Sequence, residues 1–258
     1  MALTIAGSDS GGGAGIQADL KTFDALRVHG ASAITCVTAQ NPRHVLGTQP
    51  VRTDIVRRQI EAVFAELPPA AVKTGMLFSS EMIRVVAGFF QHGKHPRLIV
   101  DPVCVSTSGA QLLRPSALTT LKTELLPRAA LVTPNLDEVE RLIGYRVECE
   151  EDMRTAARLI RREWGCAALV KGGHLPGARS AVDIFYDGKT ELLLSSPFVR
   201  GVRTHGTGCT LSAAIAAWCA RGCLLPEAVQ RAKHYVTAAI TRSHRVGRHA
   251  VLNHSPAR

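Results

Sequence analysis

Short runs of strand-forming residues alternate with longer segments of helical periodicity along most of the chain. The expected strands lie at residues 2–6, 31–39, 70–74, 97–101, 129–133 and 166–171. Between them, segments such as 15–27 and 54–66 repeat apolar residues at helical spacing, which is typical of helices that bury one face. The pattern therefore predicts an α/β fold, with a mainly parallel central sheet covered by helices on both faces.

The pattern changes after residue 180. Apolar residues alternate at Val182, Ile184 and Tyr186, and an Asp-Gly turn precedes a second alternating run. Because Asp-Gly turns favour tight hairpins, we expect an antiparallel edge hairpin over residues 181–187 and 190–194.

Two further helices are expected near the end of the chain. One begins just after Gly206-Thr207-Gly208 and reaches about residue 221, and the other spans about 226–242. No linker, repeat or low-complexity tract divides the sequence. We expect a single domain over residues 1–246 and a flexible tail over 247–258.

The composition narrows the class of protein. Of the 258 residues, 46% are hydrophobic and 20% charged, which is enough apolar material to bury a core without disulfides or metals. The seven cysteines form no CxxC pair and no Cys/His ligand spacing, which argues against a disulfide framework or a zinc site. With no charged leader and no apolar run approaching ~20 residues, we expect a cytoplasmic protein without a membrane partner.

The charge balance is strongly basic. Lys and Arg number 31 against 21 Asp and Glu, which gives a formal net charge of +10. Such an excess suits nucleic acid or phosphate groups. The basic residues are scattered among acidic ones without interleaved aromatic residues. We therefore expect no nucleic-acid partner. A nucleic-acid-binding module is the alternative from another class, and it would show steeply salt-dependent binding.

A glycine-rich turn at residues 7–15 follows the first strand and opens the first helix, where open α/β sheets bind ligands. Gly13 to Ala18 match the dinucleotide pattern G-x-G-x-x-A. That pattern also needs an acidic residue at the end of the second strand, where this chain has Gln40 and Asn41. A Rossmann oxidoreductase is therefore disfavoured, and the P-loop pattern is absent.

A second small-residue turn, Gly206-Thr207-Gly208, stands directly before a predicted helix. Small residues at a helix N-terminus leave several backbone N–H groups pointing at one spot, which favours an anion. A plain glycine turn would look the same in sequence. Cys209 follows, and because a helix N-terminus lowers the pKa of a thiol, we expect it to serve as a base.

Polar side chains also follow three of the apolar strands. Asp101 follows one, Asn135 and Glu138 follow the next, and Lys171 ends a third. Each has a structural explanation by itself, as a helix cap or a snorkelling lysine. Because the carboxyl ends of parallel strands meet at one edge of a sheet, we expect these groups to converge. A lysine, an anion hole and carboxylates able to hold Mg²⁺ through water indicate phosphoryl transfer.

Several short runs, taken in order, carry a family resemblance. They are residues 4–9, 12–22, 40–41, 73–77, 101–103, 133–135 with Glu138, 171–174 and 205–212. In these runs the chain resembles the hydroxymethylpyrimidine/phosphomethylpyrimidine kinases of thiamine biosynthesis, in the ribokinase superfamily. The resemblance implies a three-layer ribokinase-like fold and phosphorylation by ATP and Mg²⁺ of 4-amino-5-hydroxymethyl-2-methylpyrimidine and then of its monophosphate. It implies a small-molecule partner, and members of the family are often homodimers.

The resemblance also implies roles for single residues. For catalysis it points to Cys209, Gly206, Thr207 and Gly208. For the pyrimidine it points to Gln40, whose amide offers a donor and an acceptor, and to Gly7, Asp9, Ala14, Met76 and Val103. For ATP and phosphate it points to Lys171, Asn135, Lys233 and Thr204, and for Mg²⁺ through water we expect Glu138 and Asp101.

Two residues depart from the usual family pattern. Gly11 replaces a serine, which makes the first turn more flexible. Cys104 replaces a methionine and shortens one wall of the pocket, which leaves open whether a larger ring is admitted. A vitamin B6 kinase acting on pyridoxal or pyridoxine is therefore the near alternative, and a regulatory relative that only senses the pyrimidine is a third. Because the chain ends soon after the last helix, we expect no fused thiamine-phosphate synthase domain.

Overall fold

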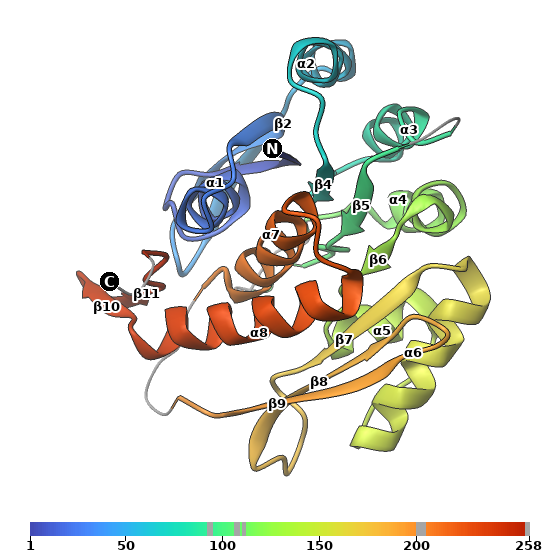
Figure 1. The fold of residues 1–258 in the computed structure, drawn as a ribbon. Helices are drawn as coiled ribbons and strands as arrows, with labels where there is room; N and C mark the ends of the chain where they lie inside the picture. The colour runs from blue at the N-terminus through green and yellow to red at the C-terminus, as the bar shows by residue number, and fades with distance from the viewer. Residues whose placement is uncertain (92–94, 106–108, 110–111, 200–204, 256–258) are drawn as a thin grey trace.

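The computed structural model describes residues 1–91, 95–105, 109, 112–199 and 205–255. Its main strands are β1 (Ala2–Asp9), β2 (Gly30–Gln40), β3 (Val45–Pro50), β4 (Ala71–Thr74), β5 (Arg97–Val100), β6 (Leu131–Val132), β7 (Ala167–Gly172), β8 (Ser180–Tyr186) and β9 (Glu191–Pro197). Within the described residues they form one sheet in the order β3-β2-β1-β4-β5-β6-β7-β8-β9 (Figure 1).

The sheet is parallel in its centre and antiparallel at both edges. Each neighbouring pair from β2 through β1, β4, β5 and β6 to β7 is parallel, whereas β8 and β9 continue as an antiparallel hairpin. The predicted parallel sheet and edge hairpin are thereby confirmed. Strand β3, antiparallel to β2 at the opposite edge, was not predicted, because Gly47 and Pro50 interrupt its short sequence.

Helices cover both faces of the sheet. They are α1 (Gly15–Ala25), α2 (Thr53–Glu66), α3 (Ser80–Gly88), α4 (Pro115–Thr120), α5 (Leu136–Ile143), α6 (Glu150–Trp164), α7 (Thr207–Ala220) and α8 (Leu225–Thr241), with a π-helical turn η1 (Leu121–Leu125) and a 3₁₀ turn η2 (Leu126–Arg128) after α4. Figure 1 shows α1, α7 and α8 together on one face, with α2 to α6 on the other. The expected three-layer arrangement is confirmed.

Alternate residues of each central strand enter different cores. In β5, Leu98 and Val100 pack with α2 to α6, whereas Ile99 between them packs with α1, α7 and α8. This period of two follows from the pleat of a strand covered on both faces. It explains why the central strands are continuous apolar runs in the sequence.

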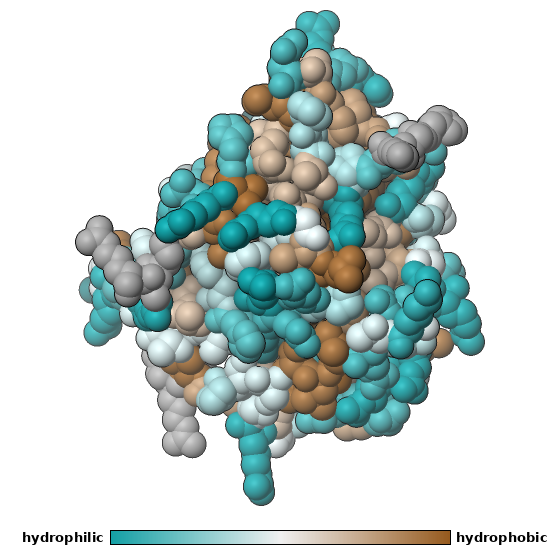
Figure 2. Space-filling model, in the orientation of Figure 1, coloured by the Kyte–Doolittle hydropathy of each residue, from teal (hydrophilic) through white to brown (hydrophobic). Residues whose placement is uncertain are grey.

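Helix α7 lies between the sheet and α8, and nine of its fourteen residues are buried. Four alanines, Ala213, Ala214, Ala216 and Ala217, are fully covered. Small side chains let a helix approach its neighbours closely, so the N-terminus of α7 is held firmly against the strand ends. Figure 2 shows hydrophilic side chains spread over the outer face of the molecule, with smaller apolar patches between them.

After α8, the strands β10 (His244–Val246) and β11 (His249–Val251) pair antiparallel as a separate hairpin. The chain then returns to the body of the protein, where Tyr235 Oη donates a hydrogen bond to the His254 carbonyl oxygen at 2.9 Å. The sequence did not predict strands in this segment. None of the helices in the described part of the chain is long and apolar enough to cross a membrane.

Candidate active site

The carboxyl ends of the parallel strands β1, β4, β5, β6 and β7 meet at one edge of the sheet, beside the N-terminus of α7. Asp101 directly follows β5, and Lys171 is the penultimate residue of β7. The Lys171 Nζ lies 3.2 Å from Asp101 Oδ1 and 3.9 Å from Glu138 Oε2. The predicted convergence of these three groups is therefore present.

Asp101 is nearly fully buried and has several donors around it. Besides Lys171, Thr133 Oγ1 donates to its Oδ1 and Ser212 Oγ to its Oδ2, each at 3.2 Å. Burial by itself raises the pKa of Asp101, but the charges of Lys171 and Lys73 outweigh it and hold this pKa below its usual range. Asp101 is therefore an ionised carboxylate.

Glu138 has two roles in the structure. Its Oε2 accepts a hydrogen bond from the Asn135 N–H while the Asn135 side chain accepts one from the Glu138 N–H, both at 2.8 Å, which completes a capping box at the start of α5. Burial raises the pKa of Glu138 to about 7, with Lys171 lowering it in part and Asp101 raising it further. The predicted cap is confirmed, and the same carboxyl group also faces Lys171.

The N-terminus of α7 faces this charged cluster. Gly206 has a φ of 86°, and a Cβ on it would overlap the carbonyl oxygen of Gly13. A Cβ on Gly208 would stand 3.2 Å from Lys171 Nζ. The two glycines therefore let the anion-hole turn approach the first glycine-rich loop on one side and the lysine on the other. The N–H groups of the first helical turn have no acceptor within a helix and are available to an anion.

Cys209 sits in this first turn and is mostly enclosed by protein, with only part of its surface exposed. Burial raises the pKa of its thiol to about 11; Lys73 lowers it in part, and Asp101 and Asp19 raise it. The expectation of a lowered pKa is thus wrong, because burial and two carboxylates outweigh the helix N-terminus. The sulfur is a neutral thiol near pH 7.

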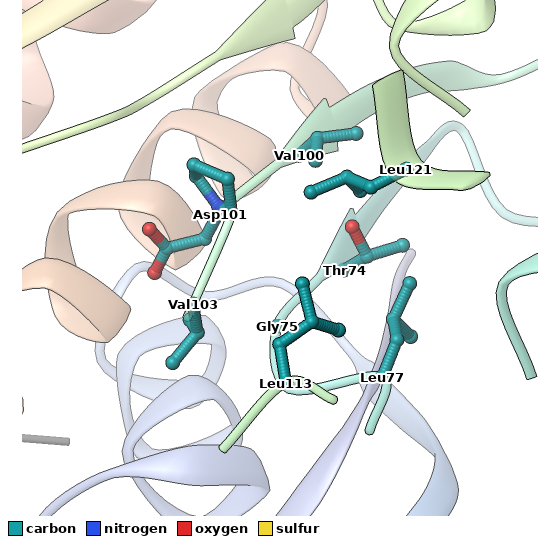
Figure 3. Close-up of a pocket in the computed structure, with 9 residues that line it drawn as sticks. Thr74, Gly75, Leu77, Val100, Asp101, Val103, Leu113 and Leu121 are labelled. Carbon is teal, nitrogen blue, oxygen red and sulfur yellow. The ribbon is translucent and has the colours of Figure 1, made fainter. Parts of the chain in front are cut away.

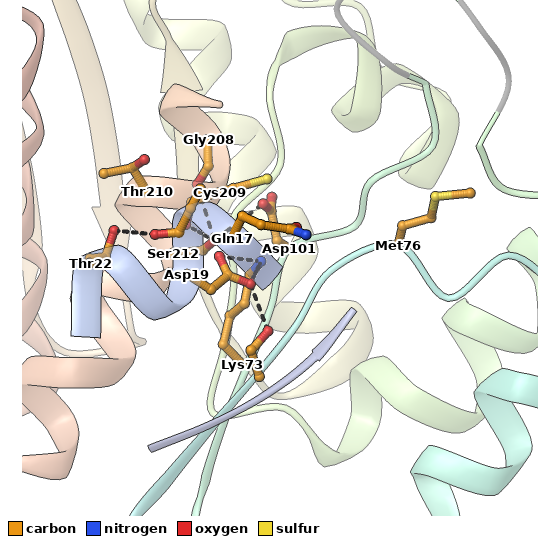
Figure 4. Close-up of polar contacts among 12 residues, drawn as sticks. Gln17, Asp19, Thr22, Lys73, Met76, Asp101, Gly208, Cys209, Thr210 and Ser212 are labelled. Carbon is orange, nitrogen blue, oxygen red and sulfur yellow. Dashed lines mark hydrogen bonds and ion pairs between the residues drawn. The ribbon is translucent and has the colours of Figure 1, made fainter. Parts of the chain in front are cut away.

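A buried ion pair lies beneath Cys209, and sequence reasoning missed it. Lys73 Nζ donates to both carboxylate oxygens of Asp19, at 2.9 and 2.7 Å, and Thr4 Oγ1 donates to Asp19 Oδ2 at 2.6 Å (Figure 4). Burial lowers the pKa of Lys73, but the acidic groups around it, Asp19 first among them, together more than offset burial and keep this pKa above its usual value. A lysine inside an otherwise apolar strand was the signal in the sequence.

The first glycine-rich loop is organised by Asp9. Its carboxylate accepts hydrogen bonds from the N–H groups of Gly11 and Ala14 at 2.8 Å and of Gly13 at 3.1 Å. Burial raises the pKa of Asp9, and hydrogen bonds from His205 and from this backbone lower it below its usual value. Asp9 therefore shapes the loop, and Gly7 and Ala14 lie at its two ends.

Apolar side chains form a small cluster at the same edge. Met76 packs against Cys36 and Leu112, with Val103 beside them. Gly7 adjoins this cluster, because a Cβ on it would stand 2.7 Å from Cys36 Sγ. A small neighbouring cavity of about 10 Å³ lies at the ends of β4 and β5. Thr74 and Val103 are among the residues that line it (Figure 3). Cys104 packs in the larger core with α2 to α6 instead.

Lys233 and Gln40 lie apart from the charged cluster of Lys171, Asp101 and Glu138, and a third predicted site residue is not described by the structure. Lys233 on α8 is buried, and its Nζ donates to Asp183 Oδ2 at 2.8 Å and to the Ala181 carbonyl oxygen at 3.0 Å. Lys233 therefore holds α8 to β8 rather than standing beside Lys171. Gln40, at the end of β2, contacts His205, a residue to which the sequence assigned no role. Thr204 lies outside the described residues.

A family model described as phosphomethylpyrimidine kinase matches residues 9–254. The chain belongs to the phosphomethylpyrimidine kinase family. A hydroxymethylpyrimidine/phosphomethylpyrimidine kinase of Rhizobium meliloti is 52% identical over 248 residues, which are 95% of this chain and 92% of that protein. The chain is also similar to a bifunctional thiamine biosynthesis protein of Geobacter sulfurreducens, but it spans only 51% of the length of that protein.

Solved structures of phosphomethylpyrimidine kinase family members and of pyridoxal kinases share the fold. An ADP complex of Bacillus subtilis pyridoxal kinase superposes with a TM-score of 0.90 at 37% identity, over 98% of this chain and 96% of that one. A phosphomethylpyrimidine kinase from Clostridium difficile superposes with a TM-score of 0.82 at 42% identity, over 93% and 98% of the two chains. The ribokinase-like fold expected from the sequence is thereby confirmed.

Proposed function

We propose that this chain is an ATP-dependent kinase that phosphorylates hydroxymethylpyrimidine and then its monophosphate in thiamine biosynthesis. The observation that carries the proposal is the position of Lys171. Its Nζ lies between the carboxylates of Asp101 and Glu138, and a Cβ built on Gly208, at the start of α7, would stand 3.2 Å from it. An amine, acidic oxygens and a helix N-terminus at one point are the parts that phosphoryl transfer requires. Two relatives that are 52% and 49% identical to the chain bear names of this activity.

Lys171 and the first turn of α7 would hold the phosphates. The amine is positioned by Asp101 and Glu138, and the backbone N–H groups of Gly208 and Cys209 supply donors for the transferring phosphoryl group. Asn135 is next to Lys171 in an isolated parallel bridge between the two strand ends. In this arrangement Lys233 supports the site from a distance, because Asp183, its partner, also accepts from the Gly172 N–H at 3.1 Å.

Glu138 and Asp101 fit a magnesium ion held through water. Their oxygens are the hard donors that Mg²⁺ prefers. No group of three or more His, Cys, Asp or Glu side chains in the described part of the chain could hold a metal ion alone. Two carboxylates plus phosphate oxygens suit an ion that keeps several of its waters. Bound there, Mg²⁺ would neutralise charge on the phosphates.

The acceptor would lie between Gln40 and the cluster of Met76 and Val103. An amide pairs with the edge of an aminopyrimidine, and the apolar side chains cover its ring. Cys209 would stand beside the hydroxymethyl group. Because its thiol is neutral at rest, positioning and charge neutralisation must supply most of the rate, which a loose transition state allows.

The decisive experiment is ADP release with MgATP and, in separate wells, hydroxymethylpyrimidine, its monophosphate, pyridoxal and pyridoxine. Turnover on both pyrimidines with little on the B6 vitamers supports the proposal. Preference for pyridoxal would establish the B6 alternative, which the likeness to pyridoxal kinase structures keeps open. Turnover on none of the four would contradict both. Lys171→Met should abolish turnover, whereas the exposed Lys189→Met serves as a matched control.

A further inference from the structure

Gln40 and the loop before α7 meet through the side chain of His205. The Gln40 amide nitrogen lies 3.0 Å from His205 Nε2, and the same Nε2 lies 3.5 Å from Asp9 Oδ2. On its other side, the Gln40 amide oxygen lies 3.2 Å from Thr38 Oγ1. His205 Nε2 therefore lies between Gln40, which is expected to bind the acceptor ring, and Asp9, which shapes the first glycine-rich loop.

Counting protons decides how this chain of contacts is arranged. Thr38 has one hydroxyl proton, and the carbonyl oxygen of Ser8 takes it at 2.7 Å, a shorter contact than the 3.2 Å to Gln40. Thr38 Oγ1 is then an acceptor for its second neighbour. An amide can turn by half a revolution and exchange its oxygen and nitrogen at the same positions. Turned in this way, the Gln40 amide donates to Thr38 and directs its oxygen at His205.

His205 is consistent with the turned amide and inconsistent with the other one. With the amide oxygen of Gln40 and the carboxylate of Asp9 both facing Nε2, a proton on Nε2 satisfies both acceptors. In the unturned arrangement Nε2 must be a bare lone pair toward the Gln40 amide while it also faces the Asp9 carboxylate, which is repulsive.

We propose that His205 is a positioning residue that carries its proton on Nε2 and thereby fixes the orientation of the Gln40 amide. With its orientation fixed, the Gln40 amide has one N–H and one oxygen lone pair left for a ligand. A ring that binds there must place an acceptor opposite this N–H and a donor opposite this lone pair. An aminopyrimidine edge, with a ring nitrogen beside an amino group, has such a pair. The identity of the ring rests on the proposed function, whereas the orientation of the amide does not.

The tautomer can be measured without any substrate. A long-range ¹H–¹⁵N correlation spectrum of protein labelled with ¹⁵N-histidine distinguishes a protonated from a bare Nε2, and comparison with His205→Gln assigns the resonance of His205. We expect a protonated Nε2 at neutral pH. A bare Nε2 would overturn the proposal, whatever the enzyme phosphorylates.

Kinetics then test whether His205 acts through Gln40. His205→Leu removes the donor, and we expect the KM for hydroxymethylpyrimidine to rise about tenfold with the KM for ATP changed less than about twofold. His205→Gln restores a donor near the Nε2 position and should recover most of this loss. The exposed His29→Leu is the matched control.

A double-mutant cycle separates this role from a merely structural one. In a Gln40→Ala background, His205→Leu should cause no further rise in the KM for the pyrimidine, because the amide that it orients is gone. Additive effects of the two substitutions would show that His205 acts independently of Gln40 and would overturn the proposal. If the unsubstituted enzyme phosphorylates no pyrimidine at all, the proposed function fails, and the histidine spectrum still decides the orientation.

Discussion

Lys73 donates to both carboxylate oxygens of Asp19, and neither side chain is exposed to solvent. The pair joins β4 to α1 beneath the first turn of α7, where Lys73 lowers and Asp19 raises the pKa of Cys209. The same two residues therefore contribute to the stability of the protein and to the electrostatics of the candidate site.

Removing one partner of this pair should destabilise the protein strongly. Lys73→Met leaves a buried carboxylate without its cation, which costs about 3–5 kcal/mol in the free energy of unfolding. The exposed pair of Arg52 and Asp54 offers the control, because Arg52→Met should cost less than about 1 kcal/mol. Urea denaturation of both variants measures the difference, and equal losses would contradict the prediction.

Gly206→Ala should be far more harmful than the same change at Gly222. Both glycines have a left-handed φ, 86° and 91°, so each alanine suffers about 1–2 kcal/mol of backbone strain. Only at Gly206 does the new Cβ overlap another segment, the Gly13 carbonyl. We expect turnover to fall at least about 100-fold in Gly206→Ala because the anion-hole turn is displaced, with Gly222→Ala close to the unsubstituted enzyme. Steady-state kinetics of both variants measure this, with circular dichroism as a check that each variant is folded. Equal turnover of the two variants would contradict the prediction.

Glu138 should make the metal-free protein less stable as the pH rises. Burial raises its pKa to about 7 from an ordinary value of 4.5, so the native state holds a proton that the unfolded state has lost. The contribution is fully present below about pH 4.5 and is lost as the pH rises through about 7, by up to about 3 kcal/mol. Glu138→Gln should abolish this loss in denaturation experiments at several pH values. An unchanged slope would show that Glu138 titrates normally.

His254 should act in the opposite direction. Burial, together with the charge of Lys21, lowers its pKa to about 4 from 6.5, so the unfolded state binds the proton more readily. Its contribution is present above about pH 6.5 and is lost as the pH falls through about 4, and it is smaller than that of Glu138 because solvent screens a partly exposed group. His254→Gln should remove this acid sensitivity. Because the two slopes oppose each other, stability of the unsubstituted protein should vary less with pH than that of either variant.

Cys209→Ala should reduce turnover more than nucleotide binding. The thiol stands in the anion-hole turn beside the expected acceptor hydroxyl, whereas the helix N–H groups that hold phosphates are backbone atoms and remain. The measurements are kcat and the Kd for ATP by calorimetry. Unchanged kcat would remove Cys209 from the reaction, and an equal loss in both would indicate a displaced helix.

The sheet and the convergence of Asp101 and Lys171 were predictable because each is a local pattern, an apolar strand followed by a polar residue. Strand β3 was not, because an exposed edge strand with Gly47 and Pro50 carries little apolar pattern. The pairing of Lys73 with Asp19 was not predicted for another reason. The two residues are far apart in the sequence, and the spacing of residues along a chain does not show which distant residues come into contact. The position of Cys209 at a helix start was readable, but its burial was not, and burial decides its pKa.

The close approach of Gly206 to the Gly13 carbonyl joins two loops that are far apart in the sequence and are therefore synthesised at different times. A nascent chain that has reached the end of β9 contains all the strands that the described residues contribute to the main sheet but lacks α7, and with it half of the proposed phosphate site. Ligands stabilise only states that bind them, so neither ATP nor the acceptor can protect the growing chain. Their protection begins only when α7 docks, so the sheet depends on its own packing in the interval between the synthesis of β9 and the docking of α7.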